Sequence, residues 1–345
     1  MAATIIDVAR HAGVSIATVS RVMNGTTAVR PDTRQRVAEA IEALGYRPNQ
    51  LARSLPGGQS DRVIGLVIPE INNPVFPEIA QAVEHEARHQ GYQVMLCQTD
   101  DRWAIELKYA KLLIDRRVSG IIFVSGSFSH VKGDMEPYRL VREANIPYVL
   151  VNSRASDSTM APVLATDEVA AGKMQAAYLL QHGHRHIGFL GGGLGYYVTR
   201  DRLLGVNQAM ASLARGETAS LTQQLGGFQQ NRATLLARTL LTQNPRPTGI
   251  LCASDLLAMI FMTQARHMGL RIPDDLSVIG FDGIQMVQHT WPPLTTIAQP
   301  LRKMGTLAVK SVLGQPINPR LELTLIKGQS VGAVPSNAIL KDVAT

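Results

Sequence analysis

Short apolar runs alternate with amphipathic stretches along the chain from residue 61 onward. Helical periodicity between the runs predicts helices near residues 75–90, 104–117, 134–144, 167–182, 200–213, 229–243 and 254–268. The apolar runs themselves are RVIGLVIP, YQVMLCQTD, GIIFVSG, YVLVNS, HIGFLGGG, TGILCAS and SVIGFDG. Strands that alternate with helices are typical of parallel sheets with right-handed crossovers. About ten strands are too many for one small sheet, so the pattern predicts an α/β domain of two lobes with a ligand between them.

The first sixty residues follow a different pattern, which begins with a well-marked helix start. Thr4 can cap a first helix that runs to about His11, and Asp7 lies in its first turn, where an acid suits the helix dipole. Gly13 can take the left-handed conformation that ends this helix. A tight turn is therefore expected after the first helix.

Two further helices are expected in this part of the chain. Ser15 can cap a second helix over residues 16–24, and a third starts near Pro31, a residue suited to the first turn. Val37 and Ile41 follow helical spacing in the third helix. Two short helices joined by a glycine turn indicate a helix-turn-helix, so we expect an all-α head.

The outer face of the second helix carries side chains that could read DNA. Arg21 can hold a guanine edge with two hydrogen bonds, and Ser15 and Ser20 can reach phosphates. Ile16 and Ala17 offer apolar contact suited to a thymine methyl group. The alternative is an ordinary arginine on a solvated helix face.

Polar residues gather where the apolar runs of the larger domain end. Parallel sheets bind ligands beyond the carboxyl ends of their strands, and carboxylates and amides can pair with hydroxyl groups. The residues at the run ends are Asn72, Asn73, Asp100, Asp101, Asn152, Ser254, Asp255 and Asp282.

Charge and composition refine the picture only slightly. The chain has 345 residues and a formal net charge of +7. Residues 1–60 hold seven Arg, no Lys and four acids, a surplus that favours polyanions weakly. Cys97 and Cys252 lie in separate apolar segments, so we expect buried, reduced thiols. No run is long enough to span a membrane, and no secretory signal is recognised, so a cytoplasmic protein is expected.

The head closely resembles that of the lactose-repressor (LacI/GalR) family over nearly all of residues 4–55. The matching runs are TIIDVARHAGVSIATVSRVMNG and RPDTRQRVAEAIEALGYRPNQLARSL. The resemblance implies that the second helix reads the major groove, with Ile16 and Ala17 varying with operator choice and Arg21 reading a base. The DNA-contacting set that it implies is Thr4, Ser15, Ile16, Ala17, Thr18, Ser20, Arg21, Asn24, Asn49, Ala52, Arg53 and Leu55.

A short hinge is expected after the head. Pro48 restricts the residue before it to extended geometry, and Asn49 can cap a short helix, QLARSL, that Pro56 stops. Such a short helix is marginal alone in water. The resemblance implies that two hinge helices meet in the DNA minor groove, where Leu55 wedges into a base step and Ala52 allows close approach. Pro56 departs from the family, and a plain linker is the alternative.

The rest of the chain resembles the effector domain of the same family, which is similar to periplasmic sugar-binding proteins. PEINNPVFPEIAQAVEHEAR, ASDLLAMI, SVIGFDG and PPLTTIAQP carry the likeness. We expect a helix-turn-helix head over residues 1–46, a hinge over 47–60 and an effector-binding and dimerisation domain over 61–345. Within the last, crossovers near residues 160, 290 and 322 would give an N-lobe of 61–160 and 291–321 and a C-lobe of 161–290 and 322–345.

The resemblance also implies an effector site in the cleft. Phe228 would stack on the ligand, Ser254 and Asp282 would bind hydroxyls, and Gln299 would close the site. The implied set is Asn72, Val75, Phe76, Asn152, Tyr196, Val198, Arg202, Phe228, Ser254, Asp282 and Gln299.

Two departures and one arginine cluster bear on the ligand. The family often has Asn at the position of Ser254, which puts that contact in doubt. Tyr196 replaces a small polar residue of the lactose-specific member, which argues against that ligand. Arg154, Arg200 and Arg202 near one cleft would favour an acidic sugar or a phosphate.

Three other sequence features were considered as evidence for a dinucleotide site, a metal site or a catalytic serine, and none supports such a site. GGGLG at residues 191–195 fails as a dinucleotide fingerprint because Tyr196 occupies the third glycine position. His182, His184 and His186 span a helix end, a turn and a strand start, so their side chains need not converge on a metal. No G-x-S-x-G motif occurs. No catalytic residues, metal or cofactor are therefore expected, and the protein is not expected to be an enzyme.

The motifs and the family resemblance together predict a sequence-specific transcriptional regulator. It is expected to act as a repressor controlled by a sugar, sugar-acid or phosphosugar effector. A homodimer on a palindromic operator is expected, because the tail VPSNAILKDVAT is too short for the heptads of a tetramer. A binding or transport module without DNA function and a sugar-modifying enzyme are the alternatives. The head counts against the first, and the lack of a base–nucleophile constellation counts against the second.

Overall fold

The computed structural model describes residues 3–23, 29–46, 62–155, 161–213 and 219–334. The chain divides into two compact units, Met1–Ser60 and Asp61–Thr345. Each unit is described by itself.

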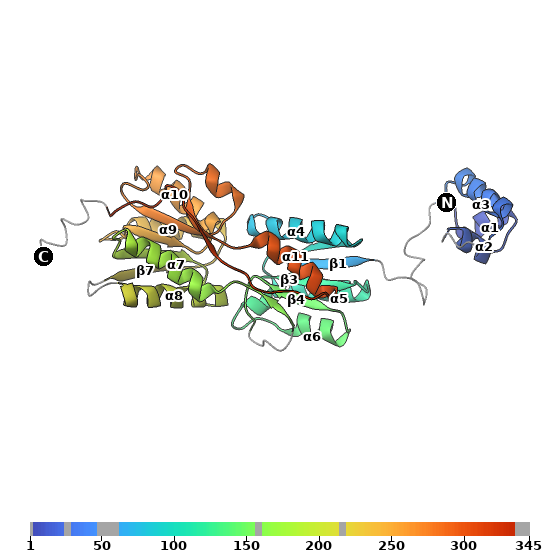
Figure 1. Cartoon of the computed structure of the whole chain (residues 1–345), viewed down its shortest axis with the longest axis horizontal. Helices are drawn as coiled ribbons and strands as arrows, with labels where there is room; N and C mark the ends of the chain where they lie inside the picture. Colours follow the sequence, from blue (N-terminus) through green and yellow to red (C-terminus); the bar gives the residue numbers. More distant parts are fainter. Residues whose placement is uncertain (1–2, 24–28, 47–61, 156–160, 214–218, 335–345) are drawn as a thin grey trace, which may run out of the picture. The chain divides into compact units, whose positions relative to one another are not determined.

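The first unit contains three helices, α1 (Ile5–Ala12), α2 (Ile16–Met23) and α3 (Pro31–Ala43) (Figure 1). Val8, Val19 and Val37 are fully buried where the helices meet. The small buried surface is what a three-helix head of this size can supply.

The predicted helix starts are confirmed. Thr4 and Asp7 form a capping box: the Thr4 side chain accepts a hydrogen bond from the Asp7 amide, and the Asp7 carboxylate accepts one from the Thr4 amide at 2.9 Å. These Thr4 hydrogen bonds hold the pKa of Asp7 below its usual value. Gly13 has φ 65, the left-handed conformation expected at the turn, and Ser15 Oγ accepts from the Thr18 amide at 3.1 Å.

The first lobe of the second unit is built on a parallel five-stranded sheet, in the order β2-β1-β3-β4-β5. Helices α4 and α11 pack together on one face of the sheet, and α5 and α6 pack together on the other (Figure 1). The strands are β1 (Val63–Ile68), β2 (Gln93–Gln98), β3 (Gly120–Val124), β4 (Tyr148–Val151) and β5 (Val163–Leu164). The helices are α4 (Val75–His89), α5 (Trp103–Asp115), η2 (Ser127–Ser129), α6 (Glu136–Glu143) and α11 (Leu301–Val312).

The second lobe is built on a six-stranded sheet, in the order β11-β10-β9-β8-β6-β7, with β11 antiparallel to its neighbour. Helices α7 and α8 pair on one face, and α9 and α10 pair on the other (Figure 1). The strands are β6 (His186–Gly191), β7 (Ser220–Leu225), β8 (Gly249–Cys252), β9 (Ser277–Asp282), β10 (Thr295–Ala298) and β11 (Thr324–Ile326). The helices are α7 (Glu168–Gln181), α8 (Tyr197–Leu213), α9 (Gln230–Leu241), α10 (Asp255–His267) and η3 (Gln285–His289).

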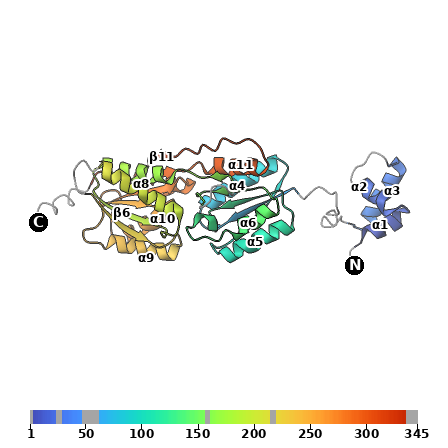
Figure 2. The same ribbon diagram turned by 90° about the horizontal axis from the view of Figure 1, so that it is seen from below.

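The chain passes between the lobes three times, and two crossings differ from the prediction. Strand β5 pairs with β4, so the first crossing follows residue 164 and not residue 160. Strand β10 pairs with β9, so the second follows residue 298 and not residue 290. The third lies in the segment between α11 and β11, which Figure 2 shows running along one side of both lobes. The short strands β5 and β10 were not recognised in the sequence, which explains both shifts.

Most strands with continuous apolar runs are buried on both faces, as expected for parallel sheets covered by helices. The exception is β2, which lies at the edge of its sheet and is only partly buried. β3, β4, β8 and β9 contain only buried residues. Cys97 and Cys252 are buried and unpaired, as predicted, and burial raises the pKa of the Cys97 thiol to about 11. Within the described ranges, no helix is both long and apolar enough to cross a membrane.

Candidate functional site

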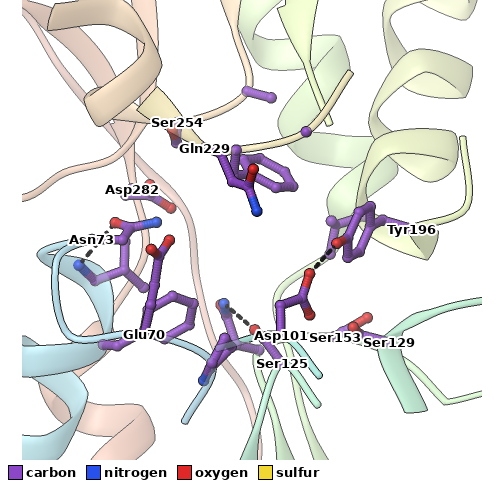
Figure 3. Close-up of a pocket in the computed structure, with 18 of the residues that line it drawn as sticks. Glu70, Asn73, Asp101, Ser125, Ser129, Ser153, Tyr196, Gln229, Ser254 and Asp282 are labelled. Atoms are coloured by element: carbon purple, nitrogen blue, oxygen red, sulfur yellow. Dashed lines mark hydrogen bonds between the residues drawn. The ribbon is translucent and has the colours of Figure 1, made fainter. Parts of the chain in front are cut away.

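A pocket of about 410 Å³ lies between the two lobes, at the ends of the strands of both sheets. Figure 3 shows side chains from both lobes pointing into the same space. Each strand from β1 to β4 and from β6 to β10 has at least one lining residue at its last position or within a few residues after it. This is the carboxyl edge at which open parallel sheets bind ligands.

The pocket gathers every effector-site residue expected from the sequence. All eleven residues of the implied set, Val198 included, line it. Lining residues that the sequence did not single out include Glu70, Ser125, Ser129, Ser153, Glu168, Gln229 and Arg232. Whether the expected residues contact an effector stays a prediction.

Asp282 lies at the buried end of the pocket, in a conformation that the surrounding structure imposes. Its φ of 121 lies in the region that favours glycine, a kind of backbone strain that clusters at binding sites. Asp255 fixes the turn by accepting hydrogen bonds from the amides of Gly283 at 2.7 Å and Ile284 at 3.0 Å. Gln299 Nε2 donates to the Asp282 carboxylate at 2.9 Å. Burial, and then the neighbouring Asp255 carboxylate, raise the pKa of Asp282 well above its usual value.

Arg202 lines the same end of the pocket, but its charge is already paired. Its Nε donates to Glu168 Oε2 at 3.0 Å, and its Nη1 donates to the Ala253 carbonyl at 2.5 Å. Its guanidinium lies 3.6 Å from the centre of the Phe281 ring, and the residue is only 3% exposed. The sequence predicts that Arg202 binds the ligand, but in the structure its charge is paired with Glu168.

Ser254 and Asn152 also have structural roles beside their place in the pocket. Ser254 Oγ accepts a hydrogen bond from the Leu257 amide at 3.2 Å and so caps α10. Asn152 Nδ2 donates to Ser125 Oγ at 3.0 Å. Its Oδ1 is buried without a hydrogen-bond partner among the described residues, which leaves one acceptor at the pocket wall.

The first-lobe side of the pocket carries an excess of carboxylates. Glu70, Asp100 and Asp101 all line it (Figure 3 labels Glu70 and Asp101). Burial and then the charges of Asp101 and Asp100 raise the pKa of Glu70. Asp100 also pairs with Arg102 at 3.6 Å. The carboxyls of this side that are ionised disfavour anionic ligands.

The arginine cluster expected to attract an acidic ligand does not form at the pocket. Arg154 pairs with Asp201, with Nη2 3.0 Å from Oδ1, and lies over the Tyr197 ring. Arg200 Nε donates to the Leu194 carbonyl at 2.7 Å. Neither arginine lines the pocket. Only Arg202 of the three arginines lines the pocket, so the cluster does not support an acidic sugar or phosphate, and the ligand class stays a prediction.

The three histidines of the HGHRH run diverge. His182 Nδ1 is paired with the Tyr178 carbonyl, His186 Nδ1 with Ser220 Oγ, and His184 with Thr248 Oγ1 at 3.0 Å. In the part of the chain that the structure describes, no group of three or more His, Cys, Asp or Glu side chains could hold a metal ion.

His184 makes the stability of the second unit depend on pH. It is fully buried, and desolvation lowers its pKa from 6.5 to about 4. The unfolded chain therefore binds more protons between these values, so the free energy of unfolding falls as the pH drops. Between pH 7 and pH 5 we expect a loss of about 2 kcal/mol from this residue. Denaturant unfolding at both pH values should show a smaller loss in His184→Gln than in the wild type or His186→Gln.

The outer face of α2 presents the residues expected to read DNA. Ile16, Ala17 and Arg21 are exposed, whereas Val19 on the opposite face is buried. Thr4 and Ser15 are exposed at the two helix starts, and Thr18 and Ser20 are half-buried. Asn24, Asn49, Ala52, Arg53 and Leu55 lie outside the described residues.

Comparison with known proteins agrees with both units. Residues 4–49 match the family model of bacterial regulatory proteins, lacI family, and residues 176–331 match a periplasmic binding protein-like domain. A regulator encoded in the aml 5′ region of Streptomyces limosus is 38% identical over 92% of this chain and 89% of its own length. The lac repressor dimer bound to operator and the anti-inducer ONPF superposes with a TM-score of 0.79, 26% identity and coverage of 96% and 100% of the two chains. A complex of the regulator CelR with cellobiose superposes with a TM-score of 0.66 and 28% identity, over 95% and 99% of the two chains.

A helix-turn-helix unit joined to a two-lobed α/β unit defines a transcriptional regulator that binds DNA with one unit and a small molecule with the other. The chain belongs to the lacI family of bacterial regulatory proteins.

Proposed function

We propose that this regulator represses transcription and that a neutral sugar, bound in the pocket between the lobes, controls its affinity for operator DNA. The observation that carries the proposal is the composition of the pocket wall. Carboxylates, amides and hydroxyls line the pocket together with the aromatic rings of Phe76, Tyr196, Phe228 and Phe281. This mixture suits a sugar ring, which has many hydroxyls and an apolar face. CelR, a structural neighbour, was solved in complex with the sugar cellobiose.

The charges of the wall favour a neutral sugar over a phosphorylated or acidic one. Five carboxylates line the pocket against two arginines. The Arg202 charge is paired with Glu168, and Asp100 is paired with Arg102. The exposed Arg232 then remains beside Glu70, Asp101 and Asp282, and burial raises the pKa of all three carboxyls. Those carboxyls that are ionised disfavour an anionic ligand.

We further propose that the chain acts as a homodimer on a palindromic operator, in the cytoplasm and as a regulator rather than an enzyme. The lac repressor dimer on its operator supports this assembly, because a two-fold dimer suits a palindromic site. The three-part division into residues 1–46, 47–60 and 61–345 remains part of the proposal. So does the DNA-contacting set, including the hinge residues Asn49, Ala52, Arg53 and Leu55.

A thermal-shift screen tests the choice of ligand. At least one neutral mono- or disaccharide should raise the Tm of the full-length protein, because a ligand that binds only the folded state stabilises it by mass action. A concentration of 100 times Kd corresponds to about 2.7 kcal/mol. The phosphorylated and carboxylated forms of the same sugar should give no shift. Stabilisation by phosphosugars alone would contradict the proposed ligand class.

A variant pair assigns the shift to this pocket. Phe228→Leu should weaken binding of the stabilising sugar by about three- to tenfold, because the ring face is lost. Leu235→Ala should leave the affinity unchanged, since Leu235 is 66% exposed on the neighbouring helix α9 and does not line the pocket. Equal losses in both variants would place the sugar elsewhere.

A further inference from the structure

Segments of both lobes meet beside the pocket through contacts made only by protein atoms. The second lobe contributes residues 195–201, the turn before α8 and its first residues. The first lobe contributes Asp101, His130 and Arg154, which follow β2, η2 and β4. We call this set of contacts the clasp.

Tyr196 makes the central contact of the clasp. Its hydroxyl donates a hydrogen bond to the Asp101 carboxylate across the lobes (Figure 3). Its ring meets the His130 ring edge-on, with centroids 4.7 Å apart, and His130 in turn meets the Trp103 ring at 5.4 Å. On the pocket side, the Tyr196 ring lies 5.7 Å from Phe228. Tyr196 therefore contacts both the other lobe and the wall of the ligand site.

The backbone joins the lobes at the same point. The Val131 amide donates to the Gly195 carbonyl at 2.8 Å, and His130 and Tyr196 form an antiparallel bridge. A Cβ atom on Gly195 would lie 2.2 Å from a carbon of the His130 ring. Real Cβ atoms do not approach so closely, so this contact requires glycine at position 195.

The first-lobe side of the clasp is held in place from within its own lobe. The buried Glu106 of α5 accepts a hydrogen bond from the Ser127 amide at 2.9 Å and another from the Tyr138 hydroxyl. Tyr138 also accepts from the Phe128 amide at 3.1 Å. The segment that leads to His130 is thus anchored to α5 and α6, and it can serve as a fixed surface for Tyr196.

An ion pair continues the contact along α8. Arg154 pairs with Asp201 and lies 3.9 Å from the centre of the Tyr197 ring. The Arg154 side chain is half exposed, so this pair contributes little by itself. It extends the clasp beyond the single Tyr196 contact.

We propose that Tyr196 is a positioning residue that holds the two lobes closed through the clasp, so that closure does not require an effector. Because every contact is between protein groups, the closed arrangement is populated before a ligand binds, and the effector selects it. A ligand then meets a smaller conformational cost than it would if it had to bring the lobes together. The consequence for effector affinity rests on the proposed function, whereas closure itself does not depend on the ligand's identity.

Hydrogen exchange of the Val131 amide in full-length protein without added sugar tests the proposal. This amide spans the lobes, so its exchange reports opening of the clasp. Tyr196→Phe keeps the ring and removes only the hydroxyl, and should raise the exchange rate about three- to tenfold. Gly195→Ala should raise it further by displacing His130. Amides in the buried strand β4 should keep their wild-type rates in both variants.

Tyr197→Phe is the matched control. It removes a hydroxyl one residue away and keeps the ring beneath Arg154, so the Val131 amide should exchange at the wild-type rate. Unchanged exchange in both Tyr196→Phe and Gly195→Ala, or an equal increase in Tyr197→Phe, would overturn the clasp. Because no sugar is added, that outcome is separate from a failure to find a sugar effector.

Discussion

Replacing Arg202 by methionine should lower the free energy of unfolding of the second unit by about 3–5 kcal/mol, because it leaves Glu168 buried without its partner. The pair is almost fully buried, with side chains 4% and 7% exposed. Burial already raises the pKa of Glu168, and Arg202 opposes that effect. Without the arginine the pKa should rise further, so the loss of stability should shrink as the pH falls and Glu168 takes up a proton.

Two further variants make this result specific. Arg200→Met removes a neighbouring exposed arginine that donates to the Leu194 carbonyl, and should cost less than about 1 kcal/mol. The double variant Glu168→Met with Arg202→Met should recover most of the lost stability, because it removes both charges. Urea unfolding measures both variants. Equal losses of unfolding free energy in Arg202→Met and Arg200→Met would show that the buried pair does not stabilise the second unit.

Replacing Arg21 by alanine should reduce the preference for operator over scrambled DNA by about 10- to 100-fold. The exposed arginine on α2 can reach a guanine edge with two hydrogen bonds. The operator is first obtained by selection from random duplexes with the wild-type protein. Binding is then measured by fluorescence anisotropy at several salt concentrations, because phosphate contacts make affinity depend on salt.

The control for Arg21 is the exposed Arg10 on α1, which pairs with Asp7 at 3.4 Å. Arg10→Ala should change the affinity for both DNA sequences alike, if at all. An equal loss on operator and scrambled DNA in Arg21→Ala would assign Arg21 to the phosphate backbone and remove its role in sequence recognition.

The strands with continuous apolar runs could be predicted from the sequence, and they brought the predicted pocket residues together. Strand β7, SLTQQL, was missed because it is a half-buried edge strand with mixed polar residues. Gln229 and Arg232 follow that strand, so its omission also hid them. Helix α11 was also missed, although it packs with α4 on one face of the sheet of the first lobe.

Charge pairing in the cleft could not be predicted from the sequence. Arg202 and Glu168 are 34 residues apart, and they meet only because α7 and α8 pack closely at Gly172, where a Cβ atom would lie 2.0 Å from the Arg202 carbonyl oxygen. Likewise, nothing near Arg154 in the chain indicates its partner Asp201, 47 residues later. The position of an arginine in the sequence therefore does not predict whether its charge is available to a ligand in the cleft.

The hinge shows a different limit. A short helix around Leu55 was expected from capping and length, and its residues lie outside those that the structure describes. Its pairing in the minor groove remains a prediction, and the DNA experiments above do not depend on it.

The most direct test of the account is a linkage measurement on the full-length protein with its selected operator. The neutral sugar that stabilises the protein is titrated with and without operator, and operator is titrated with and without that sugar. The account predicts that the sugar changes operator affinity and that the operator changes sugar affinity by the same factor. A sugar that binds with the same affinity in the presence and absence of operator would contradict control of DNA binding through the pocket between the lobes.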